Sequence, residues 1–157
     1  MRRILEIVSL AALAALFAIT ALALYGPERL PNRIPTRFDA LGRPDAWGSP
    51  RMLLLLPAVA AVIYLLMTWV ARHPSAFNLP VRVTPRNRQR LENLALAMIA
   101  WLKAEVVCFF ARIQWSAIRA ARHPGQGFSA LLMPVLLAAV FATIIGHIAA
   151  MFSAARS

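Results

Sequence analysis

The chain has 157 residues, of which 61% are hydrophobic and 15% charged, and its formal net charge is +11. This composition lies far on the apolar side of globular proteins, so the sequence predicts a single-domain, all-α integral membrane protein over residues 1–157 rather than a soluble enzyme. In a soluble protein the charge would suggest nucleic acid, but no such partner is expected, because the arginines cluster between apolar segments, where anionic lipid head groups lie.

The first apolar segment, residues 4–24, is predicted to be a membrane span that is retained as an anchor. It follows two arginines and contains one charged residue, Glu6. A cleaved signal peptide is the alternative, because the small residues Ala21 and Ala23 resemble a cleavage site. The apolar run exceeds the roughly 7 to 15 residues of a signal core, which favours the anchor.

Residues 25–51 are predicted to form a proline-rich, ordered or semi-ordered external loop. Its five prolines are incompatible with one regular helix. At its end, Ser49 and Pro50 form an N-cap signature, since serine can accept a terminal amide bond and proline has no amide to satisfy. The second span, residues 52–71, contains no charged side chain.

A third helix is predicted to begin within the basic loop of residues 72–90. Thr84 and Pro85 repeat the cap signature, and no proline or glycine occurs from there to residue 123. Such a helix would be about 55 Å long, of which residues 94–118 could be immersed. The final span is predicted at residues 129–152.

The third helix could be a span or a surface helix, because charged residues lie in its middle. Lys103, Glu105 and Arg112 would each cost roughly 2.5 to 3.5 kcal/mol at the bilayer centre. Helical periodicity aligns Lys103 with Glu92 and Gln114 and puts the other two charges nearly opposite. Two separate polar lines favour burial among partner helices over a position on the membrane surface. An apolar stripe runs between them: Leu91, Ala95, Ile99, Leu102, Val106, Phe109, Ile113 and Ala117.

The distribution of basic residues favours the surface position. With four spans, the two sides carry eight and seven basic residues outside the membrane; with a surface helix, they carry eleven and six. The positive-inside rule is better satisfied by the second arrangement. Both arrangements place the amino terminus and residues 72–90 in the cytoplasm, where the arginines can contact anionic lipids.

The loop between the first two spans carries a distinctive set of residues: Pro35, Phe38, Asp39, Gly42, Pro44, Asp45, Trp47 and Gly48. Residues 30–49 resemble an uncharacterised bacterial membrane domain, the domain of unknown function 1648, which also occurs at the amino end of immunity proteins against the sporulation-delaying toxin. The resemblance extends in element order over roughly the first half of the chain. It implies a small multi-pass protein of the bacterial inner membrane. Family members often have histidine at the position of Arg37 and asparagine at that of Asp39, and this departure weakens a metal-site interpretation of the loop.

The chemistry of the loop suggests two roles. Gly42 can adopt positive φ, Pro44 stiffens the return, and Asp45 can accept amide hydrogen bonds in a turn. Phe38 and Trp47 could lie at the head-group level. The loop is therefore either a cap anchored by interfacial aromatic residues or a recognition surface for an extracytoplasmic peptide or lipid.

Ionisable residues within the predicted spans are further candidates, because buried charges are costly unless paired. They are Lys103, Glu105, Arg112 and His147. Simple ion pairing is the alternative to a functional role, and Glu105 and Arg112 could both meet a third group on another helix. His147 follows Gly146, where a neighbouring helix could approach closely, so a packing role is expected.

No catalytic motif is present, and neither a cofactor nor a metal site is predicted. Cys108 is the only cysteine, which excludes an internal disulfide. The leading hypothesis is a non-enzymatic membrane protein whose external loop binds, senses or excludes another molecule. The alternative is a transport component, in which ionisable residues of the third helix line a polar path enclosed by a homodimer.

Overall fold

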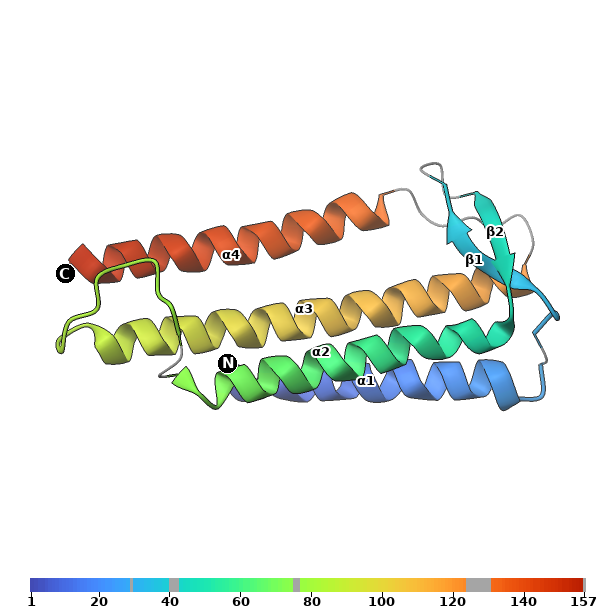
Figure 1. Ribbon diagram of the computed structural model, residues 1–157, viewed down its shortest axis with the longest axis horizontal. Coiled ribbons are helices and arrows are strands. Elements are labelled where there is room, and N and C mark those ends of the chain that lie inside the picture. Colours follow the sequence, from blue (N-terminus) through green and yellow to red (C-terminus); the bar gives the residue numbers. More distant parts are fainter. Residues whose placement is uncertain (29, 40–42, 75–76, 124–130, 157) are drawn as a thin grey trace.

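The computed structural model describes residues 1–28, 30–39, 43–74, 77–123 and 131–156, and in these ranges it is dominated by long antiparallel helices (Figure 1). They are α1 (Arg2–Tyr25), α2 (Leu55–Ala71), α3 (Arg88–Arg122) and α4 (Leu132–Arg156), and a 3-10 turn, η1 (Pro50–Leu54), leads into α2. Within the described ranges, four helices are long and apolar enough to cross a membrane, counting η1 with α2. The predicted class of helical membrane protein is confirmed.

The predicted cap is confirmed at Ser49, whereas α3 begins after Asn87, which makes no side-chain cap bond. The Ser49 hydroxyl accepts a hydrogen bond from the Arg51 amide at 3.4 Å, and Pro50 takes the first position of η1. Before α3, the Thr84 amide donates to Asn87 Oδ1 at 2.7 Å, and the Asn87 amide donates to the Thr84 hydroxyl at 3.4 Å. These two hydrogen bonds close a turn before the helix, and α3 begins at Arg88, slightly later than the signature predicts.

The α3 helix lies at the centre of the bundle, where it contacts α1, α2 and α4. Its predicted apolar stripe is buried only near its ends, and the five residues from Ile99 to Ile113 in that stripe are half-buried. The buried face instead contains Lys103 and Gln114 among small residues, which are Ala100, Ala104, Ala117, Ala120 and Ala121. Small side chains let helices approach closely where hydrocarbon surrounds the bundle. The packing of α3 along its neighbours supports a span rather than a surface position.

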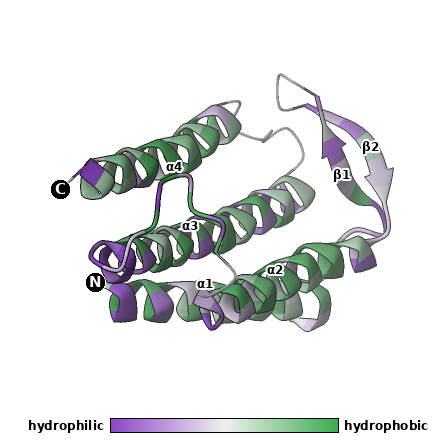
Figure 2. Ribbon diagram, turned by 60° about the vertical axis from the view of Figure 1, so that its left-hand side comes forward, coloured by the Kyte–Doolittle hydropathy of each residue, from purple (hydrophilic) through white to green (hydrophobic). Residues whose placement is uncertain are grey.

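Large apolar side chains cover the outside of the bundle. The helices consist mainly of hydrophobic residues (Figure 2). Leu65, Trp69, Phe141 and Ile145 are each more than half exposed. Because α4 contacts mainly α3, it is the least buried of the candidate spans. It continues to Arg156, beyond the predicted end at residue 152, since Met151 and Ala154 pack against α3.

The loop between α1 and α2 contains a β-hairpin that the sequence prediction missed. Strands β1 (Ile34–Phe38) and β2 (Pro44–Gly48) pair antiparallel, with register shifts on both sides of Arg37. Each strand of a two-stranded sheet has an open edge, where proline is tolerated. The Gly42 position and the Phe38 side chain lie outside what the structure describes, so their predicted roles stay predictions.

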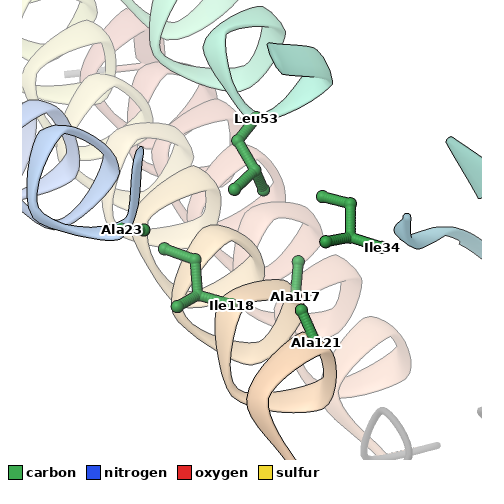
Figure 3. Packing of buried hydrophobic residues seen from close by; sticks show 6 residues of the cluster. All are labelled: Ala23, Ile34, Leu53, Ala117, Ile118 and Ala121. Carbon is green, nitrogen blue, oxygen red and sulfur yellow. The ribbon is translucent and has the colours of Figure 1, made fainter. Parts of the chain in front are cut away.

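One buried cluster joins this hairpin to the bundle (Figure 3). Ile34 of β1, 1% exposed, inserts between η1 and the carboxyl-terminal half of α3. The cluster consists of Ala23, Ile34, Leu53, Ala117, Ile118 and Ala121. The hairpin therefore has a packed base.

Thiol labelling tests the topology. With Cys108 replaced by serine, Asn78→Cys should resist an impermeant thiol reagent in intact cells, because residues 72–90 are predicted to be cytoplasmic. Gln126→Cys, outside the described residues, should be labelled if α3 crosses the membrane. Permeabilised cells provide the control in which both cysteines react. Ready labelling at Asn78→Cys would reverse the orientation, and protection at Gln126→Cys would make α3 a surface helix.

Candidate recognition hairpin and intramembrane polar clusters

The turn and strands of the hairpin are held by polar contacts among its predicted signature residues. Asp39 Oδ1 accepts a hydrogen bond from the Arg43 amide at 2.7 Å, and the Asp39 amide donates to the Arg43 carbonyl at 2.8 Å. Across the strands, Arg37 Nε donates to Asp45 Oδ1 at 2.9 Å. The Asp45 carboxylate thus forms a cross-strand ion pair with Arg37, and its predicted role as an amide acceptor in the turn stays a prediction.

The ion pair lies in solvent-accessible surroundings, and the Asp45 carboxylate raises the pKa of Arg37 through a hydrogen bond and charge attraction. Side-chain exposure varies within the hairpin. Pro35 is buried, while its cross-strand partner Trp47 is 55% exposed. Exposure of Trp47 fits an interfacial or recognition role.

Gly48 has a packing role in the signature. A Cβ at this position would lie 2.7 Å from Met52 Sδ and 2.8 Å from Thr36 Cγ2. A larger residue would displace both side chains where β2 joins η1. The presence of glycine at position 48 of the signature therefore has a steric explanation in this fold.

The predicted intramembrane residue Lys103 forms the centre of a buried cluster between α1, α2 and α3. Its side chain is 1% exposed, and Nζ lies 2.5 Å from Glu6 Oε2 and 3.2 Å from Thr68 Oγ1. The same ammonium group lies 4.6 Å from the centroid of the Tyr64 ring. A carboxylate, a hydroxyl and an aromatic face together compensate the cost of burying the lysine.

A second buried polar contact lies nearer the hairpin. Gln114, with no exposed surface, donates through Nε2 to Thr20 Oγ1 at 2.8 Å and to the Leu53 carbonyl at 2.9 Å. Thr20 in turn donates to the Leu16 carbonyl within α1. The predicted alignment of Lys103 with Gln114 is confirmed, because both side chains point from α3 toward α1 and the α2 segment.

The remaining predicted intramembrane residues do not join Lys103. Glu105 Oε1 accepts a hydrogen bond from the Thr143 hydroxyl at 2.5 Å, and His147 Nδ1 lies 2.8 Å from the Thr143 carbonyl oxygen. Arg112 is exposed and bonds Ser116 on its own helix at 3.4 Å. The predicted meeting of Glu105 and Arg112 at one group does not occur among the described residues, because Glu105 contacts α4 while Arg112, two turns further along the same side of α3, bonds Ser116.

Gly146 also departs from the prediction, since within the described part of the chain a Cβ there would meet no atom within 4 Å. Among the described residues, no group of three or more histidine, cysteine, aspartate or glutamate side chains could hold a metal ion.

A cavity of about 570 Å³ adjoins the Lys103 cluster at the end of the bundle that holds the amino terminus. Its lining includes Glu6, Tyr64 and Thr68, which contact Lys103, and three arginines, Arg2, Arg3 and Arg72. Sequence reasoning missed the partners of Lys103, although Glu6 gave a signal as the one charged residue of the first apolar segment.

Comparison with known proteins supports the resemblance seen in the loop. Residues 12–61 match the family described as "Domain of unknown function (DUF1648)". An uncharacterized protein of Archaeoglobus fulgidus is 42% identical over 76 residues, a match that covers 41% of this chain and 42% of the archaeal protein. No solved structure matches the chain. The segment from the middle of α1 through the hairpin to the start of α2 thus carries the domain of unknown function 1648.

Proposed function

We propose that the chain is a non-enzymatic protein of the bacterial inner membrane that presents the β1–β2 hairpin as an extracytoplasmic recognition surface. The observation that carries this proposal is the one-sided attachment of the hairpin. Ile34 is 1% exposed in the cluster with α1, η1 and α3, while Trp47 on the paired strand is 55% exposed. A rigid base with an exposed aromatic residue is a common arrangement at recognition surfaces.

The partner that best suits this surface is a peptide with apolar and acidic groups. Trp47 offers a large contact surface with little conformational entropy to lose, and tryptophan is enriched among residues that dominate binding. Arg33, Arg43 and Arg51 are exposed nearby in sequence and add positive charge. The resemblance to the amino end of toxin-immunity proteins is consistent with a peptide partner outside the cytoplasm.

Substitutions in the hairpin test this function. Asp45→Ala removes the cross-strand ion pair and Trp47→Ala the exposed ring, so both should reduce photo-crosslinking of a partner to the hairpin several-fold. Membrane levels should stay near wild type, since exposed contacts contribute little to stability while apolar spans are held by much larger transfer terms. Asp45→Ala should also increase cleavage of the hairpin by protease in spheroplasts.

Trp69→Ala is the matched control, because Trp69 is 59% exposed but lies near the other end of α2. It should leave crosslinking at the hairpin unchanged. If Asp45→Ala and Trp47→Ala keep the hairpin protease-resistant yet lose the protein from the membrane, these residues serve folding and the recognition proposal is wrong.

A transport component is the second candidate, and the buried Lys103–Glu6 pair beside a 570 Å³ cavity favours it. Ionisable side chains inside membranes often mark ion or proton pathways. In this function a homodimer would enclose the path. Proton or solute flux through vesicles containing the purified chain separates the two candidates, because a recognition protein produces none.

A further inference from the structure

The cavity beside the Lys103 cluster has an unusual charge balance. Glu6 is its acidic residue, and the Lys103 ammonium 2.5 Å away compensates that carboxylate. The guanidinium groups of Arg2, Arg3 and Arg72 take part in no ion pair within the described part of the chain. Three uncompensated positive charges from α1 and the end of α2 therefore surround one cavity.

The lining of the cavity combines apolar and polar residues. Ile7, Leu96 and Ala100 contribute apolar wall, and Tyr64 and Thr68 contribute polar groups near Lys103. Its volume of about 570 Å³ lies within the range of about 300–1,000 Å³ that is typical of small-molecule sites. Arginine is well suited to phosphate because its planar fork donates two parallel hydrogen bonds to an oxyanion.

From this placement we propose that the cavity between α1, α2 and α3 binds a phosphate group through Arg2, Arg3 and Arg72. The phosphodiester of an anionic phospholipid and free inorganic phosphate share this chemistry. The apolar wall beside the arginines suits the lipid, whose chains can continue along the bundle while the head group contacts the guanidinium groups. This site is independent of the hairpin function and lies at the opposite end of the bundle (Figure 1).

Lipid retention by the full chain tests the site. The protein is purified in detergent containing phosphatidylglycerol or phosphatidylcholine and examined by native mass spectrometry. One phosphatidylglycerol per chain should be retained in preference to phosphatidylcholine, whose choline screens the phosphate. Arg3→Gln with Arg72→Gln should weaken retention by tenfold or more, about the effect of losing one charge-assisted hydrogen bond.

The matched control is Arg82→Gln with Arg86→Gln, which removes the same charge from the neighbouring basic loop but leaves the cavity intact. Retention in this variant should equal that of wild type. Ala71→Phe keeps every charge and fills the cavity lined by Ala71, so it should also lose the lipid. Circular dichroism confirms that each variant keeps its helices.

Inorganic phosphate distinguishes the two sources of the ligand. Displacement of the lipid by millimolar phosphate, with direct phosphate binding that requires Arg3 and Arg72, would identify a free-phosphate site. Lipid binding that resists phosphate would identify a head-group site. The proposal is overturned if neither probe binds, or if both double variants lose phosphatidylglycerol equally, because binding would then follow net charge and not the cavity.

Discussion

Lys103→Ala is expected to destabilise the bundle by about 3 kcal/mol, because removing one partner of a buried ion pair leaves the other charge uncompensated. The Lys103 side chain is 1% exposed, and its ammonium is held by Glu6, Thr68 and the Tyr64 face. Its loss would leave the partly buried Glu6 carboxylate without its ion-pair partner and remove contacts that join α3 to both α1 and α2. The partial exposure of Glu6, 37% of its side chain, places the cost toward the lower end of the range for buried pairs.

The reconstituted protein is unfolded by increasing concentrations of a denaturing detergent, and circular dichroism monitors the loss of helix. Arg112→Ala is the matched control on the same helix, since Arg112 is exposed and has only a long hydrogen bond to Ser116. It should change stability by less than about 0.5 kcal/mol. Lys103→Met combined with Glu6→Gln removes both charges and should recover part of the loss. Equal effects of Lys103→Ala and Arg112→Ala would show that the buried cluster does not stabilise the bundle.

Ile34→Ala is expected to weaken attachment of the hairpin by about 2–4 kcal/mol, the usual range for truncating a buried isoleucine. Ile34 is the β1 residue in the cluster with Ala23, Leu53 and α3, and its removal leaves a cavity between η1 and α3 (Figure 3). The helices also pack against one another away from this contact, chiefly α1 against α3. The loss should therefore appear as local opening of the hairpin and not as unfolding of the bundle.

Hydrogen exchange and limited proteolysis of residues 34–48 measure this opening. Ile34→Val supplies a graded control, because loss of one methylene group should cost only about 0.5–1.5 kcal/mol and accelerate exchange less. A hairpin that remains equally protected in Ile34→Ala would be held mainly by its polar contacts. In that case the Arg37–Asp45 pair and the Asp39 turn would carry the rigidity assigned to the base.

The spans could be predicted from sequence because long apolar runs between prolines and arginines are independent of tertiary context. The hairpin could not, because Pro35 and Pro44 lie within its strands and the register shifts beside Arg37 break any regular alternation. Phe38 and Trp47 suggested an interface but did not show that two strands pair. The signature residues were found, while the partner of Asp45 depended on the unpredicted pairing.

The polar clusters illustrate a different limit of sequence reasoning. Periodicity placed Lys103 and Gln114 on one line of α3, and burial confirms that alignment. Periodicity does not show which faces of α1 and α2 point toward α3, so Glu6 and Thr68 could not be predicted as partners of Lys103. For the same reason, Glu105 and Arg112 shared a side of the helix in sequence, but only Glu105 meets α4.

The polar side chains on the buried face of α3 have a consequence for how the protein is inserted during synthesis. A nascent α3 exposes Lys103 and Gln114 on the face that its neighbours later cover, so its entry into hydrocarbon alone is unfavourable. Glu6, Thr20 and Thr68, which receive or position these side chains, belong to α1 and α2 and leave the ribosome earlier. Synthesis from the amino terminus thus delivers the acceptors before the donors. The third helix can then leave the translocon directly into a prepared site between its two predecessors.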